Sequence, residues 1–187
     1  ELIDLSKPKI MGILNLTPDS FYDGGKYNTV ERALKQTDSI IKAGANFVDL
    51  GAYSTKPGAK PVSVEAEKKR LLPVLERLTK IHPKTHFSID TFRSTVAADA
   101  LDRGAAMIND ISGGQFDNKM MNTVGYYNVP YVLMHTSGKP ETMQKNPKYK
   151  DVVKEVIYYF SNQIQSAYKA GINDVIIDPG FGFGKTI

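Results

Sequence analysis

Residues that could bind a polar ligand or a metal ion stand at the ends of several short apolar runs. These residues are Asn15, Asp49, Asp90, Asn109 with Asp110, His135 and Asp178. One Asp at such a position usually caps the next helix, but so many acidic and amide ends are hard to explain by capping. Carboxylates and amides without a histidine cluster suit Mg²⁺ held largely by substrate phosphates. A carboxylate can also pair with a guanidine-like edge through two parallel hydrogen bonds.

Three segments that follow these runs carry further chemistry. Residues 15–25 place an aromatic pair, Phe21 and Tyr22, among carboxylates, which favours a functional loop over a purely structural one. Residues 51–59 combine hydroxyls, a Lys and glycines, a composition that suits an anion, although a plain loop remains the alternative. Residues 180–185 fail the phosphate-loop pattern because Pro179 stands where it needs Gly. Their alternating Gly and Phe suggest backbone close to a flat ligand, with a flexible loop as the alternative.

Length, composition and charge exclude several classes of protein. The chain has 187 residues, 41% of them hydrophobic and 24% charged, with a net charge of +4, as in one globular domain. It has no Cys, which excludes disulfides, thiolate nucleophiles and Cys-ligated metal sites. No apolar run approaches the roughly 20 residues of a membrane span. Because the basic residues form no stripe, we expect neither nucleic acid nor a membrane as a partner.

The elements that must position these residues alternate along the chain. The predicted strands are residues 9–14, 47–50, 87–90, 106–109, 131–134 and 175–178. The predicted helices are residues 30–43, 64–81, 94–103, 118–125 and 152–170. Pro73 should kink the second helix or start a new helical segment. Short apolar strands separated by helices indicate a parallel sheet, either a doubly wound open sheet or a (β/α)₈ barrel.

Two features favour the barrel. Polar residues end nearly every strand, and a barrel gathers its strand ends around one mouth. The connections that follow strands are long, as at residues 52–62, whereas those from helix to strand are tight, as at residues 43–45. A barrel of about 250 residues, scaled by six of its eight units, gives roughly 190 residues, which is close to the 187 of this chain. We predict one α/β domain over residues 1–187, a (β/α)₈ TIM barrel represented by about its first six βα units, with its C-terminal quarter absent.

Several motifs, in order along almost the whole chain, closely resemble those of the dihydropteroate synthase family. They are Met11 to Phe21, Ser54 to Ala59, Ser88 to Thr91, Ile108 to Gly114 and Asp178 to Lys185. The resemblance implies a (β/α)₈ barrel and a transferase of folate biosynthesis that is a target of sulfonamides. Its reaction joins 6-hydroxymethyl-7,8-dihydropterin diphosphate to 4-aminobenzoate, giving 7,8-dihydropteroate and diphosphate, with Mg²⁺ as cofactor.

The resemblance also assigns roles to residues of this chain. The pterin would be bound by Asp90, Asn109, Asp178, Ile111 and Met134, with Asp178 facing the ring's N3 and 2-amino group. The diphosphate and the aminobenzoate would be bound by Thr55, Lys56, Pro57, Phe21, Asp23 and Phe183. Catalysis would rest on Asp90, Asn15 and Lys56, and Asn15 would also help to hold Mg²⁺.

The sequence departs from the family at two positions of this set. The family usually has Glu where Tyr53 stands and Arg where Lys56 stands, and Lys lacks the bidentate fork of Arg. Two other interpretations stay open: a pterin-binding methyltransferase domain acting on methyltetrahydrofolate, against which residues 17–21 argue, and a non-catalytic pterin-binding fragment. We further expect a cytoplasmic protein that forms a homodimer in its full-length form.

Overall fold

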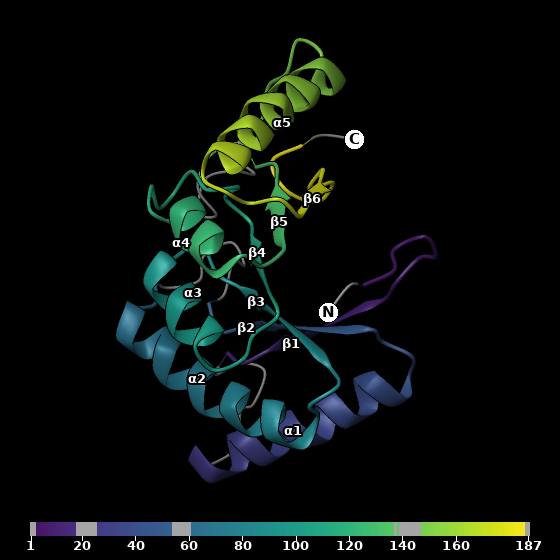
Figure 1. The fold of residues 1–187 in the computed structure, drawn as a ribbon, viewed down its shortest axis with the longest axis vertical. Coiled ribbons are helices and arrows are strands. Elements are labelled where there is room, and N and C mark those ends of the chain that lie inside the picture. Colours follow the sequence, from purple (N-terminus) through teal and green to yellow (C-terminus); the bar gives the residue numbers. More distant parts are fainter. Residues whose placement is uncertain (1–2, 18–25, 54–60, 137, 139–146, 186–187) are drawn as a thin grey trace.

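The fold is an alternation of six strands and five helices, shown by a computed structural model that describes residues 3–17, 26–53, 61–136, 138 and 147–185 (Figure 1). The strands are β1 (Met11–Asn15), β2 (Phe47–Gly51), β3 (His86–Asp90), β4 (Met107–Asp110), β5 (Tyr131–Met134) and β6 (Val175–Asp178). The helices are α1 (Lys26–Lys42), α2 (Val64–Ile81), α3 (Ser94–Leu101), α4 (Met120–Tyr127) and α5 (Val152–Lys169).

The six strands form one parallel sheet in the order β1-β2-β3-β4-β5-β6. A doubly wound sheet would reverse its strand order at a switch point, and this sheet does not. Because crossovers between parallel strands are right-handed, strands added in sequential order place every helix on the same face of the sheet. Figure 1 shows the helices along one side of the strands. This winding confirms the predicted α/β barrel architecture over its first six strands.

Side chains of the strands divide between two apolar clusters, one on each face of the sheet. The larger cluster packs against the helices and includes Val48, Leu50, Phe87, Ile89, Ile108, Tyr131 and Leu133. The smaller cluster lies on the opposite face and joins Phe47, Met107 and Val132 with Ile3, Met11 and Ile176. Neighbouring residues of a strand point to opposite faces. The residue that follows two positions after a strand member of the smaller cluster therefore also faces away from the helices.

Some helix boundaries follow from capping signals in the sequence. Helix α2 begins where predicted because the Ser63 hydroxyl caps it, accepting a hydrogen bond from the Ala66 N–H at 3.2 Å. Pro73 lies inside α2, so the suggestion that it starts a new segment is wrong. Helix α1 begins at Lys26, four residues before the predicted start, and its first turn holds no acidic residue to signal that start. Within the described ranges, no helix is long and apolar enough to cross a membrane.

Candidate active site

Four strands bring their carboxyl-terminal residues into one row across the sheet. Asn15 pairs with Gly51, Gly51 with Asp90, and Asp90 with Asn109. A Cβ atom placed on Gly51 would lie 3.1 Å from Oδ2 of Asp90 and 3.5 Å from Oδ1 of Asn15. Gly51 therefore leaves room between an amide oxygen and a carboxylate oxygen that lie on the same face of the sheet.

The last two strands extend this row on the same face. Asn109 pairs with Val132 of β5, and Met134, two residues further along β5, pairs with Asp178 of β6. Because residues two apart in a strand share a face, Met134 and Asp178 lie on the face of Asn109. The structure thus brings Asn15, Asp90, Asn109, Met134 and Asp178 to one edge of the sheet, away from the helices.

Asp49 lies below this row and fixes one of its members. Its Oδ2 atom accepts a hydrogen bond from the Asn109 amide nitrogen at 3.0 Å. Because a carboxylate can only accept, this bond directs the amide nitrogen of Asn109 toward Asp49. The amide oxygen of Asn109 is thereby left for a ligand. The hydroxyl of Ser88, which pairs with Asp49 in the sheet, is a second donor beside this buried carboxylate. The sequence pointed to Asp49 only as a strand end, although β2 continues to Gly51.

Asp90 is the most perturbed acid of the site. Burial raises its pKa well above the ordinary range of an Asp, and the negative charges of Asp49, Asp110 and Glu67 raise it further. Burial likewise raises the pKa of Asp49, although hydrogen bonds from Ser88 and Asn109 oppose the effect. Among the described residues, none donates a hydrogen bond to the carboxyl group of Asp90. A ligand that brought N–H donors or positive charge would therefore be favoured at this carboxyl group.

The loop after β6 holds Asp178 in place. The Gly180 N–H donates to Oδ1 of Asp178 at 2.8 Å, which fixes one carboxylate oxygen and leaves the other for a ligand. The Lys185 ammonium donates to the carbonyls of Gly180 at 2.9 Å and Phe183 at 3.1 Å. Burial lowers the pKa of Lys185, while the charge of Asp178 opposes that shift. The predicted site residue Phe183 thus lies, half-buried, on the loop whose backbone carbonyls accept these hydrogen bonds from Lys185.

Two polar strand-end residues face away from this row, which corrects the expectation that all of them meet at one mouth. Asp110 follows Asn109 and so points to the helix side, where it accepts hydrogen bonds from four donors: Ser112 N, Ser112 Oγ, Gly114 N and Tyr131 Oη. His135 is buried, with its ring centroid 4.8 Å from that of Tyr159. Both are structural. Asp110 also fixes the turn that carries Ile111, a predicted pterin contact, which is buried.

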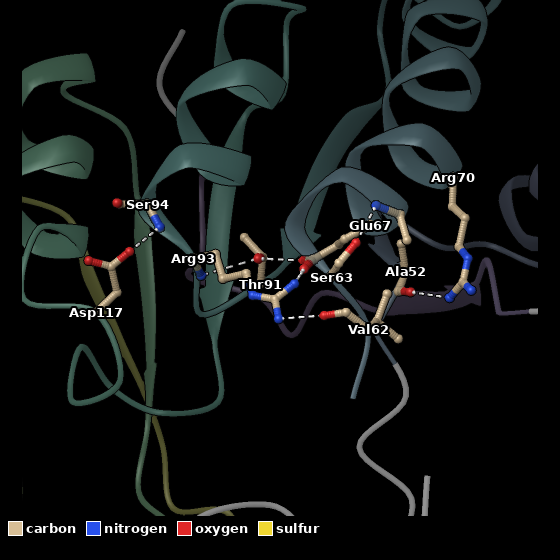
Figure 2. A network of polar contacts seen from close by, with 10 residues as sticks. Ala52, Val62, Ser63, Glu67, Arg70, Thr91, Arg93, Ser94 and Asp117 are labelled. Carbon is tan, nitrogen blue, oxygen red and sulfur yellow. Dashed lines mark hydrogen bonds and ion pairs between the residues drawn. The ribbon is translucent and has the colours of Figure 1, made fainter. Parts of the chain in front are cut away.

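Five predicted site residues lie outside the described residues: Phe21, Asp23, Thr55, Lys56 and Pro57. Both flanks of residues 54–60 are described, and Figure 2 shows a partly buried network of polar contacts at the Val62 flank. Glu67 of α2, 1% exposed, receives a hydrogen bond from the Thr91 hydroxyl at 2.7 Å and an ion pair from Arg93 at 2.6 Å. Arg93 also donates to the Val62 carbonyl at 2.6 Å. We call Val62, Glu67, Thr91 and Arg93 the Arg93 network.

Mg²⁺ is the metal that the sequence predicts, and the donors present fit a weakly held ion. In the described ranges, no group of three or more His, Cys, Asp or Glu residues could hold a metal by itself. Mg²⁺ usually keeps several waters and uses one or two protein oxygens together with substrate phosphates. The Asn15 amide oxygen, which makes no hydrogen bond to a described residue, suits such a shared site.

Comparison with known proteins assigns the chain to a family. The family model described as pterin binding enzyme matches residues 11–187. The chain belongs to the pterin binding enzyme family. Among the members of this family, dihydropteroate synthase of a Synechocystis strain is 41% identical over 179 residues. The alignment covers 95% of this chain and 62% of that protein, so the chain spans less than two thirds of that relative.

Solved structures of pterin binding enzymes share the fold of this chain. A dihydropteroate synthase from Yersinia pestis, in complex with a sulfonamide drug, superposes with a TM-score of 0.90 at 40% identity, covering 98% of this chain and 67% of that one. The Xanthomonas albilineans dihydropteroate synthase, solved with 4-aminobenzoic acid, gives a TM-score of 0.88 at 42% identity, covering 97% and 64%. These likenesses support the barrel assignment made from the strand order.

Proposed function

We propose that this protein is a dihydropteroate synthase, which condenses 6-hydroxymethyl-7,8-dihydropterin diphosphate with 4-aminobenzoate and releases diphosphate. The observation that carries the proposal is the row of acceptors on one face of the sheet, in a chain that belongs to the pterin binding enzyme family. Asp178 presents a free carboxylate oxygen, Asn109 an amide oxygen and Asp90 an unpaired carboxyl group. A pterin ring, with its guanidine-like edge of N–H donors, matches this set.

The chemistry requires these residues to stabilise positive charge. The bond between the pterin's methylene carbon and the diphosphate oxygen breaks, and its electron pair leaves with diphosphate. The aromatic amine of 4-aminobenzoate then bonds to that carbon and loses a proton. Positive charge grows on the methylene and the conjugated ring, where Asp90 would stabilise it. The N–H donors of the ring would first draw Asp90 into its ionised form, because they favour the carboxylate over the neutral acid.

The leaving group requires other residues of the predicted site. When bound, Mg²⁺ neutralises the negative charge of the departing diphosphate. Asn15 would offer it one oxygen from the end of β1. Thr55 and Lys56 would contact the diphosphate and the aminobenzoate, with Phe21, Asp23, Pro57 and Phe183 around the aminobenzoate. An aromatic amine is neutral near pH 7, so this mechanism needs no strong general base.

The test is turnover by the protein expressed from its complete gene. We expect formation of 7,8-dihydropteroate and diphosphate that depends on 4-aminobenzoate, on the pterin diphosphate and on Mg²⁺. Binding of 4-aminobenzoate in the presence of diphosphate and Mg²⁺ separates the alternatives, because only the synthase needs an aminobenzoate pocket. Transfer of a methyl group from methyltetrahydrofolate, or pterin binding without turnover, would refute the proposal.

Three further properties belong to this proposal. Sulfonamides should compete with 4-aminobenzoate, as the sulfonamide complex of the Yersinia pestis protein suggests. The protein would act in the cytoplasm and as a homodimer. Competition kinetics, cell fractionation and sedimentation of the protein from its complete gene test these three properties in turn.

A further inference from the structure

We infer that Arg93 is a positioning residue, which holds the connection between β2 and α2 through its contacts with Val62 and Tyr53 and is itself fixed by the buried Glu67. The inference rests on the proposed function, because that connection contains Thr55, Lys56 and Pro57. It concerns residues that lie outside the acceptor row and do not touch the proposed pterin site.

The ion pair between Arg93 and Glu67 is the fixed part of this arrangement. Glu67 lies on the buried stripe of α2 with Leu71, Val74 and Leu78, so its charge has no access to water. Its two oxygens are used by different partners, the Thr91 hydroxyl at 2.7 Å and the Arg93 guanidinium at 2.6 Å. The Thr91 hydroxyl also accepts a hydrogen bond from the backbone N–H of Arg93 at 3.2 Å. The guanidinium is therefore fixed in direction, as Figure 2 shows.

From this position the guanidinium reaches both ends of the connection. One nitrogen donates to the Val62 carbonyl at 2.6 Å, immediately before the Ser63 cap of α2. The guanidinium carbon also lies 5.2 Å from the ring centroid of Tyr53, two residues after β2 ends. A planar guanidinium can hydrogen bond in its plane while its flat face lies on a ring, and a compact ammonium has neither that planar fork nor that flat face.

The aromatic contacts extend this support along the loops that follow three strands. Tyr53 packs edge-on against Phe92 at 5.0 Å, and Phe92 packs edge-on against Phe116 at 5.5 Å, both measured between ring centroids. Arg93 also lies over Phe92, with its guanidinium carbon 5.3 Å from that ring's centroid. Phe92 comes two residues after Asp90, so one cation links the β2 connection to the end of the strand that carries Asp90.

The experiment compares Arg93→Lys and Glu67→Gln with a matched control, Lys68→Met. Arg93→Lys keeps the positive charge but loses the planar fork, and Glu67→Gln removes the buried negative charge. Lys68 is the next residue of α2 and forms a 2.8 Å ion pair with Asp99 of α3, away from the β2 connection. All proteins are expressed from the complete gene, and thermal unfolding confirms that each is folded.

The first measurement is hydrogen exchange, which does not depend on activity. We expect the backbone amides of residues 53–62 to exchange faster in Arg93→Lys and Glu67→Gln than in Lys68→Met or the wild type. Equal exchange in all four proteins would overturn the inference. This measurement also separates the two proposals, because a wild type that makes no dihydropteroate would refute the function and leave the exchange comparison valid.

The second measurement is steady-state kinetics with both substrates. We expect the KM for 4-aminobenzoate to rise on the order of 10-fold or more in the two network variants, a size typical of misplaced contact groups. Affinity for a dihydropterin should change little in Arg93→Lys, because its proposed ligands stand on β3, β4 and β6 and the charge of Glu67 near Asp90 is kept. Equal weakening of both substrates, or the same effect in Lys68→Met, would show a general loss of structure and overturn the positioning role.

Discussion

Replacing Asp110 by Asn should destabilise the protein although the two side chains have nearly the same shape. Asp110 is fully buried, and its Oδ1 accepts from Ser112 N at 2.8 Å and Ser112 Oγ at 2.7 Å. Its Oδ2 accepts from Gly114 N at 3.0 Å and Tyr131 Oη at 2.6 Å. An Asn amide has only one acceptor atom, so its NH₂ group must face two of these donors.

The size of the loss follows from which donors can adapt. A hydroxyl can rotate and accept from the NH₂ group, but the N–H of Gly114 or Ser112 cannot. One backbone N–H is therefore left without an acceptor, which costs about 1–3 kcal/mol in a buried site. The remaining bonds also lose their charge assistance. That second loss is partly offset, because Asn removes the desolvation cost of the buried charge. This cost is visible in Asp110, whose pKa is raised by burial despite its four donors. We expect Asp110→Asn to lower the free energy of unfolding by about 2 kcal/mol.

Urea unfolding of the protein from its complete gene measures this change, and an exposed counterpart in the same chain provides the control. Tyr127 donates to Asp102 at 2.7 Å in a similar Tyr–Asp bond, but that bond is exposed. Asp102→Asn should change stability by no more than about 0.5 kcal/mol, as exposed substitutions usually do. The midpoint should fall in Asp110→Asn while the slope stays constant. Equal losses in the two variants would refute the reasoning, since burial would then not set the cost.

Three other changes have outcomes that the structure sets. Asp90→Asn should flatten the pH dependence of unfolding by urea: the raised pKa of Asp90 gives stability that is present below the ordinary Asp pKa of about 3.9 and is lost as pH rises through the folded-state pKa. An unchanged pH profile would contradict this. Asp178→Asn should weaken pterin binding by about 2–4 kcal/mol in calorimetry, because its oxygen stays on Gly180 and its NH₂ meets ligand donors; unchanged affinity would rule out the assignment. Gly125→Ala should lose about 2 kcal/mol or more in urea unfolding, because its Cβ would collide with the Ala170 carbonyl, whereas Gly182→Ala, with no described atom within 4 Å of that Cβ, should not.

The sequence predicted the elements well where apolar periodicity and capping signals agree. Ser63 marks the start of α2, and Gly44, with φ of +102°, ends the turn after α1 as expected. It also predicted the barrel, because polar strand ends and long loops after strands distinguish it from an open sheet. The start of α1 at Lys26 was missed, since the apolar stripe begins only at Val30 and the first turn of the helix holds no acidic residue.

The candidate site was harder to read because a polar residue at a strand end has two possible directions. Alternation along β4 would have separated Asn109 from Asp110, had the face of one been known. Only strand pairing fixes that face, through the link from Asp90 to Asn109. The Arg93 network was missed for a different reason. Glu67 does fall on the apolar stripe of α2, which signals a buried charge, but its partners come 24 and 26 residues later and no local pattern identifies them.

The contrast between the two faces of the sheet supports the proposal that one of them binds a ligand. On the helix side, Asp110 is satisfied by four donors, as expected of a buried carboxylate with a structural role. On the opposite face, the carboxyl group of Asp90 receives no hydrogen bond from the described residues. A buried acid without donors is costly, and a bound ligand that supplies donors would offset that cost. Since a carboxylate can only accept, such a ligand would bring N–H donors or positive charge, which is the character that a pterin ring would provide.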